Sequence, residues 1–190
     1  METSTEAGDR VVIGTERLLI RPWESTDVAA ALGIYGDPEV TRWLRPLMGR
    51  VRDERTMAAV LDRWRAADRE AVAAGRPVGH WAVQRREDHR VVGGVSLQYL
   101  APDDADLEVA WQLSRDAWGH GYAAEAGAAL VRWVLHASDV LEVFALVGAH
   151  NVRAAATAVR VGMERVGETD EYGILPLQVY RLRHADLGVL

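Results

Sequence analysis

Hydrophobic positions along the chain repeat with two periods, and the period indicates which segments are helices. Between Asp53 and Ala74, apolar side chains recur every three or four residues, which is typical of one face of an amphipathic helix. The residues of that face are Met57, Val60, Leu61, Trp64, Ala67 and Ala71. Gly75 is expected to end this helix. Further helices are predicted over residues 26–35, after residue 38, and over residues 122–136 and 151–161.

Shorter segments rich in alternating or β-branched residues predict strands. These segments cover residues 17–21, 80–86, 90–100, 107–113, 142–147 and 177–182. The second and third are joined by a charged turn and form a predicted hairpin. Pro22 ends the first strand because proline has no amide hydrogen to donate. The order of strands and helices predicts a mixed α/β sheet with helices on its faces.

The length of the chain predicts one domain. The sequence has 190 residues, within the roughly 100–200 residues of a typical single domain. Residues 1–10 are mostly polar or small and are expected to be a mobile tail, without the apolar region of a secretory signal peptide. The folded domain is expected over residues 11–184, followed by a short tail at residues 185–190. No stretch approaches the ~20 apolar residues of a membrane helix.

Composition and charge exclude several classes of function. The chain has 22 Lys and Arg residues against 28 Asp and Glu residues, for a formal charge of −6, so non-specific nucleic-acid binding is not expected. It has no cysteine, which excludes disulfides, cysteine nucleophiles and thiolate metal sites and is compatible with a reducing cytoplasm. Its histidines and carboxylates lack metal-ligand spacing. We therefore expect a cytoplasmic protein with no metal, no nucleic-acid partner and no membrane partner.

The segment after residues 107–113 has the clearest chemical pattern. A predicted strand leads into a turn that contains Gly119 and Gly121 and opens a predicted helix. Glycine has no Cβ, so an anionic group can approach the backbone closely. The first amides of a helix lack partners, and the helix dipole adds about half a positive charge there. The turn is therefore predicted to bind a phosphate or diphosphate, with a simple tight turn as the alternative.

Two other phosphate-binding motifs compete for this turn. A P-loop needs Lys followed by Ser or Thr directly after its second glycine, whereas Gly121 is followed by Tyr122 and Ala123. The dinucleotide fingerprint G-x-G-x-x-G/A is satisfied from Gly119, and Glu142 follows at about the right separation of ~20 residues. However, that acidic residue should end the next strand, and Glu142 begins it. An NAD(P)-dependent oxidoreductase is therefore the second-ranked alternative.

Four segments in order indicate a family. They are Thr15 to Pro22, Glu108 to Leu113, Trp118 to Ala126, and Asn151 followed by Gly162-Met163. Together they resemble the GCN5-related N-acetyltransferase (GNAT) superfamily, in particular its ribosomal-protein alanine acetyltransferase-like branch, over nearly all of residues 15–183. The resemblance implies a single-domain α/β fold with a twisted, mostly antiparallel sheet of about seven strands, a splayed central pair of strands and about four flanking helices.

The resemblance also implies acetyl-CoA as co-substrate and a primary amine as acceptor. The positions that would contact the pantetheine arm are Trp111, Gln112, Leu113 and Asn151, and those that would contact the pyrophosphate are Trp118, Gly119, His120, Gly121, Tyr122 and Ala123. A splayed strand has backbone groups that can pair with the pantetheine amides as an added strand would. Asn151 can alternatively cap the helix that follows it.

An acceptor amine must lose a proton during acetyl transfer, because a lysine-like amine has a pKa of about 10.4 in water. Glu108 is the predicted base, since relatives carry a glutamate at a similar strand position; a solvent-facing glutamate is the alternative. Relatives often supply Tyr or Ser as the general acid, but Ala154 and Ala158 occupy those positions. Water is the predicted proton donor, with Tyr172 or Thr157 as substitutes, and a non-catalytic acyl-CoA-binding module is the alternative function.

A further departure from the family pattern is Asp116, where many relatives have Gln or Arg. A carboxylate that pointed inward would repel pyrophosphate, and the adjacent Arg115 is expected to compensate. The acceptor is left open among protein N-terminal alanine, aminoglycosides, polyamines and other small amines. A homodimer is the assembly that is common among relatives.

Overall fold

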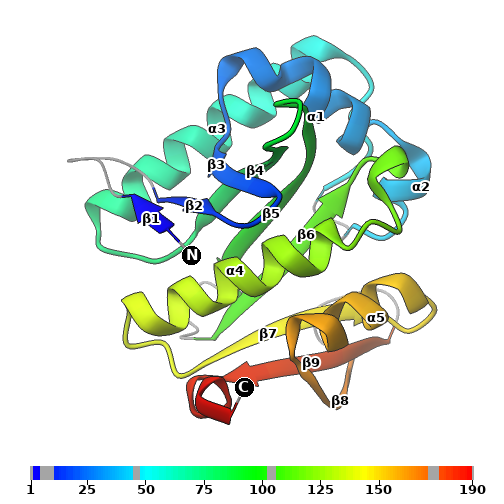
Figure 1. The fold of residues 1–190 in the computed structure, drawn as a ribbon. Helices are drawn as coiled ribbons and strands as arrows, with labels where there is room; N and C mark the ends of the chain where they lie inside the picture. Colours follow the sequence, from blue (N-terminus) through cyan, green and yellow to red (C-terminus); the bar gives the residue numbers. More distant parts are fainter. Residues whose placement is uncertain (1, 5–10, 45–47, 102–105, 171–175, 190) are drawn as a thin grey trace.

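A single sheet of nine strands forms the centre of the molecule in the computed structural model, which describes residues 2–4, 11–44, 48–101, 106–170 and 176–189 (Figure 1). The strand order is β1-β2-β3-β4-β5-β6-β7-β9-β8, and only β6 and β7 are parallel neighbours. The strands are β1 (Glu2–Ser4), β2 (Val12–Gly14), β3 (Leu18–Pro22), β4 (Gly79–Arg85), β5 (Val91–Tyr99), β6 (Leu107–Leu113), β7 (Glu142–Gly148), β8 (Glu164–Thr169) and β9 (Leu177–Arg183).

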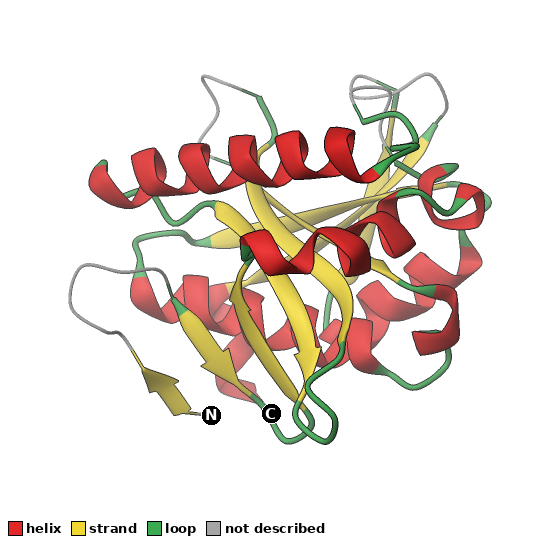
Figure 2. Ribbon diagram, turned by 90° about the horizontal axis from the view of Figure 1, so that it is seen from above, coloured by secondary structure: helices red, strands yellow, loops and turns green. Residues whose placement is uncertain are grey.

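Helices cover both faces of this sheet (Figure 2). They are α1 (Val28–Tyr35), α2 (Pro38–Thr41), α3 (Glu54–Ala73), α4 (Tyr122–Ala137) and α5 (Val152–Val161), with short 3₁₀ helices at η1 (Ser25–Asp27), η2 (Arg115–Ala117) and η3 (His184–Val189). α1 and α3 pack over one hydrophobic core, and α4 packs with α5 over the other. Within the described ranges, no helix is long and apolar enough to cross a membrane.

The longest predicted helix is confirmed and illustrates how local residues set its ends. The Asp53 side chain accepts a hydrogen bond from the backbone N–H of Thr56 at 2.8 Å, which caps the first turn of α3. Met57 and Leu61 of the predicted apolar face are fully buried against α1 and the sheet. Gly75 follows with φ +65°, a left-handed conformation that glycine adopts without strain.

The predicted fold class is confirmed, with two additional strands inside the expected domain. The sequence pattern did not predict β2, which has three residues, or β8, whose residues are nearly all exposed. An exposed strand has no buried face and therefore no hydrophobic alternation. Structure also occurs within the expected tails: β1 pairs with β2 through its backbone, and η3 lies at the C-terminal end. The five α-helices of the described residues match the five that the sequence pattern predicts, one more than the family resemblance implies, and the extra one, α2, is a single turn.

The expected splayed pair is β6 and β7. Their pairing is confined to Leu107 opposite Val143 and Glu108 opposite Phe144, at the beginning of both strands. Beyond Glu108 the two strands diverge, and β6 continues to Leu113 over about 17 Å at ~3.4 Å per residue. We call the opening between residues 108–113 and 144–148 the wedge. It is closed at Glu108 and open toward the turn that leads into α4.

Candidate active site

The glycine turn has the backbone conformation that anion binding requires. Gly119 and Gly121 have φ values of +81° and +80°, in the left-handed region that favours glycine. A Cβ added to Gly119 would meet no atom within 4 Å, so the backbone is open to a ligand there. Gly121 is the N-cap of α4 and has no side chain to cap it. The first N–H groups of α4 therefore have no side-chain cap, and their binding of a diphosphate stays a prediction.

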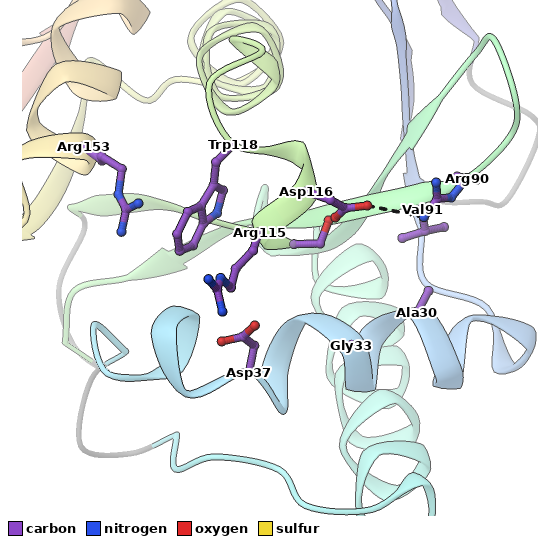
Figure 3. A pocket seen from close by; sticks show the side chains of 10 residues that line it. Ala30, Gly33, Asp37, Arg90, Val91, Arg115, Asp116, Trp118 and Arg153 are labelled. Atoms are coloured by element: carbon purple, nitrogen blue, oxygen red, sulfur yellow. Dashed lines mark hydrogen bonds and ion pairs between the residues drawn. The ribbon is translucent and has the colours of Figure 1, made fainter.

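A cavity of about 980 Å³ lies beside this turn (Figure 3). Its lining residues come from α1, the loop before α2, the start of β5, the segment around η2, and α5. Arg115 and Arg153 bring two guanidinium groups to it, and the guanidinium of Arg153 lies 3.8 Å from the centre of the Trp118 ring. The Trp118 indole N–H donates to the carbonyl of Leu113 at 3.0 Å. The lining has three arginines, Arg90, Arg115 and Arg153, against two aspartates, Asp37 and Asp116, and this excess of positive charge favours an anionic ligand.

Asp116 lines the same cavity, and its carboxylate is paired with a different arginine from the one expected. Its carboxylate forms an ion pair with Arg90 at 3.4 Å, whereas Arg115 points toward Asp37 across the cavity (Figure 3). A hydrogen bond from Ser114, aided by the charge of Arg90, lowers the pKa of the Asp116 carboxyl. The prediction that Arg115 compensates the charge of Asp116 is therefore wrong, and Arg90 is the arginine that pairs with it.

Three of the four predicted pantetheine residues lie on β6, and their side chains contact other parts of the protein. Trp111 packs into the core on the α4 face, beside Gly127. Gln112 points to the opposite face, where its Oε1 accepts a hydrogen bond from the Tyr35 hydroxyl at 3.3 Å. Leu113 is buried. Any contact with pantetheine would therefore be made by the backbone of these residues along the wedge. That contact stays a prediction.

Most side chains of the glycine turn contact other residues of the same turn. The Nδ1 atom of His120 is 3.0 Å from the carbonyl oxygen of Trp118, and its ring stacks on Tyr122 with centroids 5.5 Å apart. Tyr122 is buried, Ala123 lies in the first turn of α4, and the contact of either residue with the pyrophosphate stays a prediction. Asn151 accepts a hydrogen bond from the N–H of Ala154 at 3.2 Å and caps α5. The cap interpretation accounts for Asn151, and its contact with coenzyme A stays a prediction.

A network that the sequence analysis missed connects this turn to the N-terminal strands. Glu125 of α4 accepts hydrogen bonds from the Thr15 hydroxyl at 2.6 Å, the Arg17 backbone N–H at 3.0 Å and the Arg17 Nε at 2.7 Å. Arg17 also donates from Nη1 to the carbonyl of His120 at 2.9 Å, inside the turn. We call Thr15, Arg17 and Glu125 the latch. Two of the family-like segments, residues 15–22 and 118–126, meet in it.

The ionised form of Glu125 is favoured in the folded protein. Burial raises the pKa of its carboxyl, but hydrogen bonds from Thr15 and Arg17 and the charge of Arg17 outweigh burial, so the pKa lies below its ordinary value of 4.5. A group with a lowered pKa stabilises the fold above its unfolded value. The contribution of the latch is therefore present above about pH 4.5 and is lost as the pH falls through the lower folded pKa.

Glu125→Gln is expected to loosen the turn without affecting the chemical step. The variant keeps the shape of the side chain but loses the charge that binds Arg17, a partly exposed pair worth about 1 kcal/mol. We expect the KM for acetyl-CoA to rise about 3- to 10-fold at pH 7 with kcat unchanged, and the acid-dependent loss of stability to decrease. The matched control is Glu168→Gln, which breaks an exposed pair with Arg165 on β8. An unchanged KM in Glu125→Gln would show that the latch does not position the turn.

Glu108 lies at the closed end of the wedge and is 8% exposed, so the alternative of a solvent-facing glutamate is wrong. Ala158 is buried and Ala154 is partly buried at the positions of the usual general acid. Thr157 donates its hydroxyl hydrogen to the carbonyl of Arg153 at 3.0 Å, and Tyr172 lies outside the described residues. Water therefore stays the predicted proton donor.

One splayed parallel pair of strands and a glycine turn at its open end are the features expected of the acyltransferase class. The acetyltransferase (GNAT) domain model matches residues 17–164, and the chain belongs to this family. It is an acyltransferase of the N-acetyltransferase type. A curated relative, the uncharacterized N-acetyltransferase YoaA of Bacillus subtilis (strain 168), is 20% identical over 166 residues, which cover 85% of this chain and 87% of YoaA.

Two solved structures illustrate the shared fold. The ribosomal-protein-S5-alanine acetyltransferase from Vibrio fischeri has a TM-score of 0.75 at 16% identity, covering 93% of this chain and 98% of that one. RimJ of Mycobacterium smegmatis, in complex with CoA-disulfide, has a TM-score of 0.74 at 16% identity, covering 90% of this chain and 83% of that one. The mostly antiparallel sheet differs from the parallel sheet of a dinucleotide-binding fold, so the fingerprint at Gly119 does not indicate an oxidoreductase.

Proposed function

We propose that the protein transfers the acetyl group of acetyl-CoA directly to a primary amine. The observation that carries the proposal is the continuity of the wedge with the glycine turn. β6 and β7 separate beyond Glu108, and the chain after β6 leads into Gly119 and Gly121 with their left-handed backbone. A diphosphate at the turn and an extended pantetheine arm in the wedge would bring a thioester to the closed end, beside Glu108.

Different groups of the protein would bind the diphosphate, bind the pantetheine arm and accept the proton of the amine. The amides at the start of α4, with Arg115 and Arg153, would hold the diphosphate, and the edge of β6 would pair with the pantetheine amides. Acetyl-CoA supplies the activated acyl group. Glu108 would accept the proton of the amine, directly or through water, as the C–N bond forms and the C–S bond breaks. Water would protonate the departing thiolate, which is a tolerable leaving group because a thiol has a pKa of about 8.5.

The acceptor class is proposed as a primary amine, with a protein N-terminal alanine as the first candidate. The Vibrio fischeri structure with the same fold is named for an alanine of ribosomal protein S5, and the sequence resembles the same branch of the family. Spermidine and kanamycin represent the polyamine and aminoglycoside alternatives. Acceptor loops diverge freely within one fold, so the panel must include all three kinds of amine.

Two measurements test the proposal. Isothermal titration with acetyl-CoA, with NADPH titrated separately, is expected to show binding of acetyl-CoA alone. Thiol release with an alanine-starting peptide, spermidine and kanamycin is expected to show turnover with at least one amine. Coenzyme binding without turnover of a broad amine panel would favour the non-catalytic acyl-CoA-binding module. No heat with acetyl-CoA at millimolar concentration would contradict the proposed function.

A further inference from the structure

An aspartate and a histidine that the proposed mechanism does not use lie on the face of the sheet covered by α1 and α3. Asp68 of α3 is 6% exposed, and its Oδ1 is 2.9 Å from Nδ1 of His80 on β4. Its Oδ2 accepts a hydrogen bond from the backbone N–H of His80 at 3.2 Å. The ring of Trp64, also on α3, stacks on the imidazole with centroids 4.7 Å apart and planes 8° apart. These contacts hold the imidazole in one orientation.

The partners of His80 also determine where its proton lies. An ionised carboxylate can only accept, so Nδ1 donates to Asp68, and in a neutral imidazole Nε2 is then an acceptor. The side-chain nitrogen of Gln98 on β5 is 2.7 Å from this Nε2 and must donate to it. The amide oxygen of Gln98 therefore points away from His80. Asp68 and His80 thus set the direction in which Gln98 presents a hydrogen-bond acceptor.

The register of the sheet places Gln98 beside the proposed base. Gln98 pairs directly with Glu108 across β5 and β6. Directly opposed residues of antiparallel strands share a face, with their Cβ atoms about 5 Å apart. Gln98 is exposed to solvent, whereas Glu108 is buried at the closed end of the wedge. An acceptor that reaches Glu108 from the solvent on this face would pass Gln98.

We propose that Gln98 binds the acceptor amine through its side-chain oxygen, and that Asp68 and His80 are positioning residues for it. The inference rests on the proposed function and names a residue that recognises the acceptor. An amine offers N–H donors, which match an amide oxygen held next to a carboxylate. If the amide were reversed, its NH₂ group would face the amine, and two donors would oppose each other. The Asp68–His80 pair therefore selects for acceptors that donate hydrogen bonds.

The test measures amine binding separately from catalysis. Protein saturated with coenzyme A is titrated calorimetrically with the alanine-starting peptide, spermidine and kanamycin. For the amine that the wild type binds best, Gln98→Leu is expected to raise Kd about tenfold or more, which corresponds to the loss of one hydrogen bond to a charged amine. Gln98→Glu presents an acceptor oxygen in either orientation and adds a negative charge, so it should bind a cationic amine at least as tightly as the wild type does. Gln178→Leu on β9 is the matched control, because that glutamine also hydrogen-bonds a neighbour, the Tyr180 hydroxyl.

The positioning role has its own readout. His80→Phe keeps a ring against Trp64 and is expected to raise the amine Kd in the wild-type background but not in the Gln98→Leu background, because both changes remove the same contact. A merely structural role would give additive effects. Equal amine affinity in Gln98→Leu and wild type, or no binding of any of the three amines, overturns the inference. Failed binding of acetyl-CoA would instead contradict the proposed function, and the amine titrations on coenzyme-free protein would still test Gln98.

Discussion

Replacing Gly121 by valine is expected to remove most of the affinity for acetyl-CoA. Gly121 has φ +80°, where a β-branched residue is strained by about 1–3 kcal/mol, and its added Cβ would lie 3.5 Å from Nη2 of Arg17 in the latch. The turn would relieve this strain by moving the amides at the start of α4 away from the diphosphate. We expect the KM for acetyl-CoA to rise about 30-fold or more, equivalent to about 2 kcal/mol.

The matched control for this variant is Gly75→Val. Gly75 also has a left-handed backbone, with φ +65°, and a Cβ there would meet no atom within 4 Å. It lies after α3, far along the chain from the turn, so it carries the same kind of strain without the anion site. Both variants should lower the melting temperature, but only Gly121→Val should raise the KM for acetyl-CoA. If the two variants have equal KM values for acetyl-CoA, the glycine turn does not take part in binding the coenzyme.

Features of the site that depend only on residues close together in the sequence could be predicted. The strand ending at Leu113, the two glycines and the start of α4 form one continuous segment, and their pattern alone predicted an anion-binding turn. The apolar face of α3 is likewise a local repeat with its cap at Asp53. Asn151 could be assigned two roles for the same reason, since a helix cap is also a local feature.

Contacts between distant segments could not be predicted, because they depend on strand register and packing. Glu125 and Thr15 are 110 residues apart in the sequence and meet only when α4 packs beside the loop between β2 and β3. The proximity of Gln98 to Glu108 follows from the pairing of β5 with β6, which a shift of one residue would destroy. Sequence adjacency suggested Arg115 as the partner of Asp116, whereas proximity in space makes it Arg90.

Glu108→Gln is expected to have the largest effect on the chemical step. The variant keeps the size and hydrogen-bonding capacity of a side chain that is 8% exposed at the closed end of the wedge, but it cannot accept a proton. Loss of a general base typically lowers the rate about 10²- to 10⁴-fold, so kcat should fall by at least about 100-fold at pH 7. The KM for acetyl-CoA should change little, because the turn and the strand edge that bind the coenzyme are intact.

The pH dependence of this variant distinguishes a base from a residue that only binds the amine. Without a base, transfer requires an amine that is already neutral. The neutral fraction of an amine rises tenfold per pH unit below its pKa, which is about 8 for a protein N-terminus and about 10.4 for a lysine-like amine. The rate of Glu108→Gln should therefore increase steeply with pH and approach the wild-type rate in alkaline buffer. Glu142→Gln, at the start of the neighbouring strand β7, is the control and should retain the wild-type profile. If Glu108→Gln transfers acetyl groups at the wild-type rate across the pH range, the proton must leave the amine by a route that does not involve this carboxylate.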